Sequence, residues 1–156
     1  MLESSAELNL SGDGLSCLIK AALSKKACLR LKASGFSMFP FIRDGDILTI
    51  DAFQGRPRLG EVAAALHPVT EKLIIHRIVS KANGSYLLKG DNMFKPDGLF
   101  SSQDILGRVI RIEHKQRHLF VGLGPGRSFI AILSSSRLLP SLLLPVYRYA
   151  RWLRSI

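Results

Sequence analysis

The stretch that decides the fold lies at residues 72–89 and reads KLIIHRIVSKANGSYLLK. Its first half is rich in Ile and Val, which is typical of a β-strand, so residues 72–80 are predicted to form one. Asn83-Gly84 is a residue pair that favours a two-residue hairpin turn. Residues 85–89 are then the returning strand. The stretch therefore predicts an antiparallel hairpin near the middle of the chain.

Outward from this hairpin, strand patterns recur in both directions. Further strands are predicted at residues 28–33, 46–52, 61–66, 105–113 and 118–123, with Gly107 interrupting the strand at 105–113. Residues 90–102 are predicted to be a loop, because turn residues are frequent there. An amphipathic helix is predicted over about residues 14–26. This pattern indicates a mainly β fold with a partly barrel-like core and helical ends.

Composition and charge narrow the class of protein. The chain has 156 residues, 47% of them apolar and 22% charged, as expected for one globular domain with a real core. The net charge is +10, but residues 1–113 hold 15 Lys and Arg against 12 acids, while residues 114–156 hold seven and no acid. The nearly balanced body has no cluster of basic residues and no helix-turn-helix, zinc-finger or RNP pattern. We therefore expect no nucleic-acid partner.

Three segments are predicted along the chain. Residues 1–26 form a helical segment, residues 27–123 a β domain, and residues 124–156 a basic, apolar, helical tail. The tail fits two interpretations equally well, a membrane-interfacial segment over residues 128–156 or helices packed on protein. No run of 18 uncharged apolar residues predicts a membrane span, and the acidic start lacks the features of a secretory signal peptide. The expected location is the cytoplasm or the inner membrane face.

Three short segments contain residues suited to peptide hydrolysis. They are residues 35–40 (GFSMFP), residues 75–79 (IHRIV) and residues 89–92 (KGDN), the last followed by Asp97. A serine hydroxyl becomes an effective nucleophile when a histidine takes its proton and a carboxylate orients that histidine. Composition alone does not single out these residues, because the chain has many serines and four histidines.

In their order and spacing, these segments resemble the S24/S26 serine peptidases over roughly residues 27–113. The branch they resemble most is the signal-peptidase group of endoplasmic-reticulum and archaeal type, in which a histidine replaces a lysine base. The resemblance implies the curved β-sheet of signal-peptidase and LexA-like proteins. It further implies that Ser37 is the nucleophile, His76 the general base and Asp97 the carboxylate that orients His76. Met38 would support the oxyanion, and Asp91 would be a supporting carboxylate, although either aspartate could orient His76.

The resemblance predicts a serine endopeptidase of signal-peptidase type that cleaves a leader or precursor peptide and needs no cofactor and no metal. The substrate would lie extended along an edge strand, with small residues beside the cut. The usual Gly-Asp-Asn-Asn ends in Met93 here, a usual Gly-Asp is Gly60-Glu61, and no N-terminal membrane anchor is predicted.

Two alternatives remain from the sequence, a catalytically inactive binding module of the same fold and a self-cleaving repressor. The repressor is disfavoured because residues 1–30 are too short for a DNA-binding domain. Phe36, Phe39 and Phe41 either line the substrate cleft or pack the loop. The remaining histidines, at positions 67, 114 and 118, are expected to be solvated and without a role.

Overall fold

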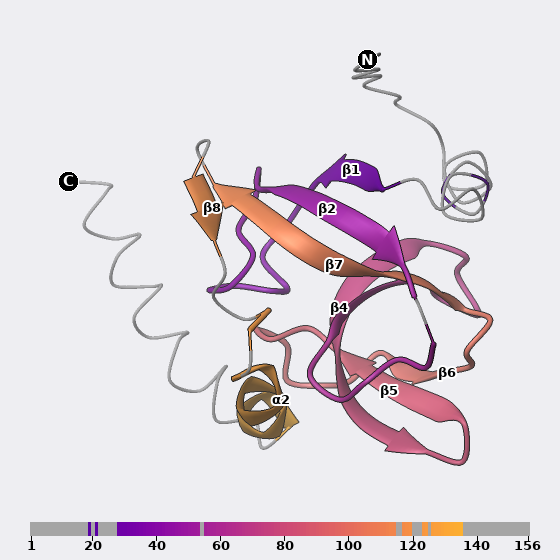
Figure 1. Ribbon diagram of the computed structural model, residues 1–156. Helices are drawn as coiled ribbons and strands as arrows, with labels where there is room; N and C mark the ends of the chain where they lie inside the picture. The colour runs from indigo at the N-terminus through magenta and orange to yellow at the C-terminus, as the bar shows by residue number, and fades with distance from the viewer. Residues whose placement is uncertain are drawn as a thin grey trace.

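The chain folds around a single antiparallel β-sheet (Figure 1). The computed structural model describes residues 19, 21, 28–53, 55–114, 117–119, 123–124 and 126–135. Within these residues, α2 (Arg127–Ser135) is accompanied by eight strands, which are β1 (Leu29–Lys32), β2 (Ile47–Ala52), β3 (Val62–Leu66), β4 (Leu73–Ala82), β5 (Ser85–Lys89), β6 (Gly98–Phe100), β7 (Ile105–His114) and β8 (Arg117–Leu119).

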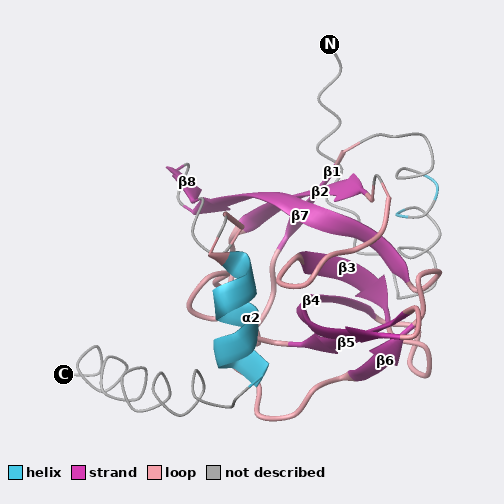
Figure 2. Ribbon diagram, turned by 60° about the horizontal axis from the view of Figure 1, so that its bottom comes forward, coloured by secondary structure: helices cyan, strands magenta, loops and turns pink. Residues whose placement is uncertain are grey.

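Seven strands follow one path through the sheet, in the order β1-β2-β7-β3-β4-β5-β6, and β8 pairs separately with β7. The sheet does not close into a barrel, because β1 and β6 end the path without pairing to each other (Figure 2). The predicted mainly β fold is confirmed, with an open sheet as its core.

Two apolar clusters hold the sheet together, and β3 contributes to both. Val62 and Ala64 belong to one cluster, whereas Ala63 and Ala65 belong to the other, as alternation along a strand requires. All four side chains are buried. The first cluster also contains Met38, so the segment that holds Ser37 is anchored in the core.

The predicted strands at residues 28–33, 46–52, 61–66, 72–80, 85–89 and 105–113 are confirmed as β1 to β5 and β7, with bounds that differ by up to two residues. The hairpin turn at Asn83-Gly84 joins β4 to β5, where Ala82 pairs with Ser85. The strand predicted at 118–123 is β8 at Arg117–Leu119, and residues 120–122 lie outside the described residues.

The interruption predicted at Gly107 is wrong, because β7 runs through it. Gly107 pairs with Ala52 of β2 on one side and with Ala64 of β3 on the other. A Cβ at this position would lie only 2.5 Å from the backbone oxygen of Asp51. The missing side chain therefore lets β2 and β7 approach closely at the centre of the sheet.

The prediction of an unbroken loop over residues 90–102 is also wrong, since β6 lies within it. Its three residues pair with Leu88, Leu87 and Tyr86 of β5. A strand of three residues that begins with glycine shows no alternating pattern, so only its pairing reveals it.

Most of the two predicted helical ends lies outside the described residues. Of residues 14–26, Ile19 and Ala21 are described and are helical. In the tail, α2 contacts β4, and the remainder beyond Ser135 is not described. The part of the chain that is described contains no helix with the length and apolar character needed to cross a membrane.

Candidate active site

Strand β4 places two consecutive functional side chains on opposite faces of the sheet. His76 and Arg77 pair with Ala63 and Val62 of β3, which belong to different apolar clusters. Ala63 is fully buried and small, so the imidazole beside it has room on its face. The alternation of an ordinary strand thus directs His76, the predicted general base, and Arg77 to opposite faces of the sheet.

Ser37, His76 and Asp97 lie in hydrogen-bonding contact with one another in a row. The His76 Nε2 atom lies 2.9 Å from Ser37 Oγ, and Nδ1 lies 2.6 Å from Asp97 Oδ2. A carboxylate can only accept, so Nδ1 carries the proton and Nε2 presents its lone pair to the serine hydroxyl. His76 is 8% exposed, which shields these contacts from water while leaving the serine end accessible.

The turn that presents Ser37 is held at both of its ends. The Gly35 N–H donates to Asp44 Oδ1 at 2.8 Å, and the Phe41 and Ile42 N–H groups donate to the Met38 carbonyl. Met38 itself is 4% exposed. Its side chain therefore fastens the turn to the core one residue after the nucleophile.

Two backbone amides of this turn remain available for a ligand. Within the described part of the chain, neither the Ser37 N–H nor the Met38 N–H donates a hydrogen bond. Unused N–H groups beside a nucleophile are the type of donor that stabilises an oxyanion. The Met38 N–H is therefore available for the oxyanion-supporting role that the resemblance implies for this residue.

The loop after β5 clamps the nucleophile turn from the other side. The Asn92 N–H donates to the Ser37 carbonyl at 2.8 Å, and the Asn92 side-chain amide donates to the Phe36 carbonyl at 3.2 Å. The sequence does not predict that Asn92 holds the nucleophile turn. Asn92 lies in a recognised motif, but the motif does not show that its partners are carbonyl groups 55 and 56 positions earlier in the chain.

Gly90 lies where the nucleophile turn, His76 and the loop after β5 come together. A Cβ at this position would lie 2.7 Å from the Ser37 carbonyl oxygen and 3.2 Å from His76 Nε2. Any other residue would push the nucleophile turn away from the histidine. Glycine is required here by this close approach alone.

Asp91 meets Arg77 and not His76. Arg77 donates through Nε and Nη2 to the two carboxylate oxygens at 2.8 and 2.7 Å, and through Nη1 to the Gly60 carbonyl. Both side chains are fully buried, and the Phe41 ring lies 5.5 Å from the Arg77 Cζ atom. Of the two aspartates, Asp97 contacts the imidazole and Asp91 contacts Arg77, which favours Asp97 as the residue that orients His76.

The other histidines and the phenylalanines of the sequence analysis have the following surroundings in the structure. His114 was expected to be solvated and idle, but its Nδ1 lies 2.6 Å from buried Asp46. His67 accepts from the Val69 and Thr70 N–H groups, and the side chain of His118 lies outside the described residues. Among the phenylalanines, Phe41 packs on Arg77, whereas Phe36 is 51% exposed.

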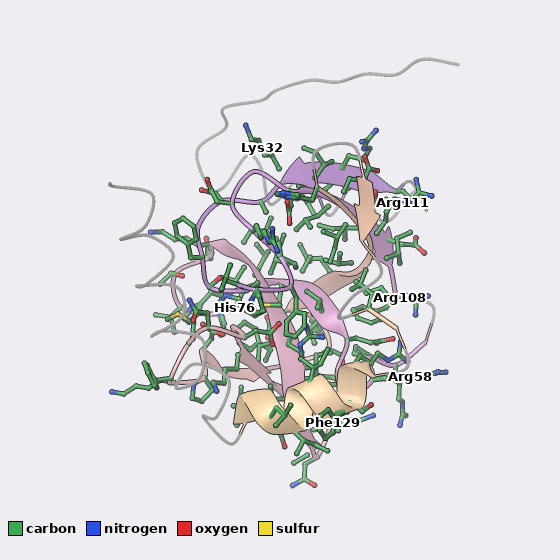
Figure 3. The ribbon with its side chains drawn as sticks, turned by 90° about the vertical axis from the view of Figure 1, so that its left-hand side faces the viewer. Lys32, Arg58, His76, Arg108, Arg111 and Phe129 are labelled. Carbon is green, nitrogen blue, oxygen red and sulfur yellow. The ribbon has the colours of Figure 1, made fainter. Side chains whose placement is uncertain are left out.

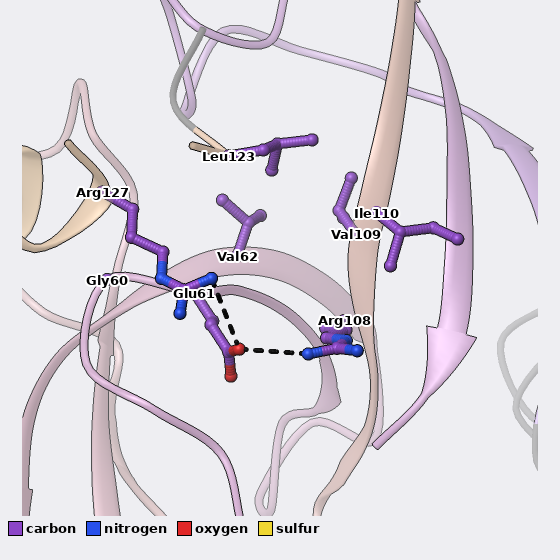
Figure 4. A pocket seen from close by; sticks show the side chains of 8 residues that line it. All are labelled: Gly60, Glu61, Val62, Arg108, Val109, Ile110, Leu123 and Arg127. Carbon is purple, nitrogen blue, oxygen red and sulfur yellow. Dashed lines mark hydrogen bonds and ion pairs between the residues drawn. The ribbon is translucent and has the colours of Figure 1, made fainter. Parts of the chain in front are cut away.

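A cavity of about 160 Å³ lies elsewhere, and none of Ser37, His76 and Asp97 lines it (Figure 4). Glu61 is at its centre, with Oε1 3.3 Å from Arg108 and 3.8 Å from Arg127 at the start of α2. Two guanidinium groups thus share one carboxylate, which leaves the cavity with an excess of positive charge. No group of three His, Cys, Asp or Glu side chains in the described ranges could hold a metal ion.

The described strands form an open antiparallel sheet, and a serine, a histidine and an aspartate are in line beside it, as in serine hydrolases. The family model for Peptidase S24-like proteins matches residues 8–110, about two thirds of the chain. The chain belongs to this family. No protein of curated function matches it.

Proposed function

We propose that the protein is a serine endopeptidase of signal-peptidase type that cleaves a leader or precursor peptide. The observation that carries this proposal is the continuous contact from Ser37 Oγ through the His76 ring to Asp97, at 2.9 and 2.6 Å. Membership of the Peptidase S24-like family supports the same reaction class.

In the proposed reaction, Ser37 Oγ attacks the scissile carbonyl while His76 Nε2 takes the hydroxyl proton. Asp97 stabilises the resulting imidazolium through Nδ1. The Ser37 and Met38 N–H groups donate to the carbonyl oxygen as it becomes an oxyanion. His76 then returns the proton to the leaving amine, and a water molecule releases the acyl group from Ser37 by the same steps.

The competing proposal of an inactive binding module has less support. Such a module has no need to keep a serine hydroxyl within hydrogen-bonding reach of a histidine that a carboxylate orients. Nor does it need Gly90, whose lack of a side chain is what allows this approach.

A serine-reactive fluorophosphonate probe tests the proposal without knowledge of the substrate. We expect a covalent adduct that mass spectrometry maps to Ser37, and we expect none in the Ser37→Ala variant. Ser34→Ala is the matched control, since Ser34 is an exposed serine three residues away and should leave labelling unchanged. An unlabelled wild-type protein, or labelling that survives in Ser37→Ala, contradicts the proposal. Cleavage of a leader-bearing precursor by wild type and not by Ser37→Ala then tests the endopeptidase step.

We also propose that α2 and the basic tail hold this peptidase against an anionic membrane surface. Phe129 and Ile132 are 65% and 58% exposed on α2, three residues apart and therefore on one helix face. Figure 3 shows Phe129 on the outer side of α2, with Arg58, Arg108 and Arg111 along one side of the molecule in that view. Exposed apolar side chains near arginines suit a lipid surface that carries negative charge.

A further inference from the structure

Three large apolar side chains are exposed on the two segments that the Asn92 hydrogen bonds join, one that contains Ser37 and one that follows Asn92. Phe36, Met93 and Phe94 are 51%, 42% and 48% exposed, and we name them the apolar rim. We infer that the apolar rim receives a medium-to-large apolar side chain of the substrate, next to the scissile bond. This inference rests on the proposed peptidase function and adds a substrate class to it.

Met93 lies near Ser37 and His76, across the position of Gly90. The point that a Gly90 Cβ would occupy is 2.7 Å from Met93 Cγ, 2.7 Å from the Ser37 carbonyl oxygen and 3.2 Å from His76 Nε2. The thioether side chain and the two reacting residues therefore surround a single point. A peptide with its carbonyl at Ser37 Oγ brings the neighbouring side chains of that peptide to Met93.

The hydrogen bonds of Asn92 join the Phe36 segment to the loop that carries Met93. Asn92 immediately precedes Met93, and it donates to the carbonyls of both Phe36 and Ser37. The Met93 N–H in turn donates to the Gly90 carbonyl at 3.0 Å, which closes the loop that presents residues 93 and 94. The rim thus spans two segments far apart in sequence, and its halves are joined by the same bonds that fix the nucleophile.

The composition of the rim selects the kind of side chain that binds there. Its residues carry no charge, and covering their exposed surface with another apolar group is favourable. Met93 is flexible and polarizable, so it can adapt to side chains of different shape. A rim of this kind favours Leu, Met or Phe beside the cut, in contrast to the small residues that family resemblance alone would imply.

A peptide library with varied residues on both sides of the cut tests the inference. We expect wild type to favour Leu over Ser beside the cut. Met93→Gln keeps the length of the side chain and makes its end polar, so it should lower kcat/KM for the Leu peptide by about tenfold. The kcat/KM for the Ser peptide should fall much less, by about twofold, because a short polar side chain gains little from an apolar rim. Phe36→Gln should act in the same direction.

Val69→Gln is the matched control, because Val69 is an apolar residue 83% exposed in the turn between β3 and β4. This variant should leave the Leu to Ser preference unchanged. The rim inference fails if wild type cleaves the Leu and Ser peptides equally well, or if Met93→Gln lowers kcat/KM for both peptides by the same factor. In either case, probe labelling of the wild-type protein still supports Ser37 as the nucleophile. If wild type neither labels nor cleaves, the proposed function itself fails.

Discussion

His76 and Arg77 are neighbours in β4, and each meets a different aspartate from the same loop. His76 contacts Asp97 at 2.6 Å, whereas Arg77 forms a two-bonded pair with Asp91. The contact with Asp97 uses Nδ1 of His76 and leaves Nε2 for Ser37. The pair with Arg77 bonds both carboxylate oxygens of Asp91, whose side chain is fully buried. Two aspartates six residues apart therefore have separate partners, and we predict a role in the chemistry for Asp97 and a role in the fold for Asp91.

Asp97→Asn tests the chemical function. The uncharged amide does not stabilise an imidazolium as the carboxylate does, and its NH2 group can donate to Nδ1 and favour the wrong tautomer, so probe labelling of Ser37 should slow by on the order of 10²–10⁴-fold. The midpoint of thermal unfolding should change little, because the Asp97 side chain is partly exposed. A labelling rate equal to that of wild type contradicts the assignment of Asp97.

Asp91→Asn tests the structural function. It leaves the Arg77 guanidinium buried without a full countercharge, so the free energy of unfolding should fall by about 3–5 kcal/mol. Denaturant unfolding followed by circular dichroism measures this loss. Arg30→Gln is the control, because it removes an ion pair to Glu113 whose arginine is 59% exposed, and it should cost less than about 1 kcal/mol. Equal losses in the two variants contradict the assignment.

The resemblance to the S24/S26 peptidases singled out Ser37, His76 and Asp97 in the sequence, and the structure brings their side chains into contact. Asn92 lies in one of the motifs that carry this resemblance, yet its function depends on carbonyl groups far away in the chain that local spacing does not reveal. The rim residue Met93 was noted only as a departure from the family pattern. Its position against His76 follows from the fold of the loop, which no periodicity describes.

At the scale of elements, alternation of apolar and polar residues predicts the strands that have one apolar and one polar face. It does not predict a strand that is defined only by its pairing with a neighbour. In β1 the leucines Leu29 and Leu31 are half-buried while Arg30 and Lys32 are exposed, so the pattern is visible in the sequence. β6 has no such pattern and exists through its bonds to β5. Gly107 looked like a break because a glycine weakens an isolated strand, whereas here it permits close packing.

Gly107→Ala tests the packing of the central strands. The added methyl group would meet the Asp51 backbone oxygen, so β2 and β7 must separate locally. We expect the free energy of unfolding to fall by about 1–3 kcal/mol, measured by denaturant titration. Ile110→Thr in the same strand is the control, since Ile110 is 42% exposed and should cost less than about 1 kcal/mol. A Gly107→Ala variant as stable as wild type would show that the strands tolerate the side chain.

At the scale of the whole molecule, the charge is distributed unevenly between the body and the tail. The +10 total suggests nucleic acid when taken as one number, but residues 1–113 account for only +3 of it. The site needs no basic surface, because the triad and the apolar rim carry no excess positive charge. Two arginines flank the Glu61 cavity, Arg108 from β7 and Arg127 from the start of α2, which is a helix with two exposed apolar residues.

Vesicle binding tests whether this end of the molecule meets a membrane. The full chain should bind phosphatidylglycerol vesicles more tightly than phosphatidylcholine vesicles, and added salt should weaken the binding because it screens the arginines. The double variant Phe129→Ser, Ile132→Ser should bind about tenfold more weakly, since it removes the apolar contact. Val69→Ser is the control and should bind as wild type does, because Val69 is exposed on a different element.

Deletion of residues 124–156 shows, by the same vesicle-binding measurement, whether the tail or the sheet contacts the membrane. If the deleted protein still binds the vesicles, the sheet and not the tail makes the contact, and the membrane proposal is wrong. If binding is lost while fluorophosphonate labelling of Ser37 remains, the two functions are independent. That outcome is the expected one, because no atom of α2 belongs to the contacts among Ser37, His76 and Asp97. The tail then governs where the peptidase acts, and the sheet governs what it cleaves.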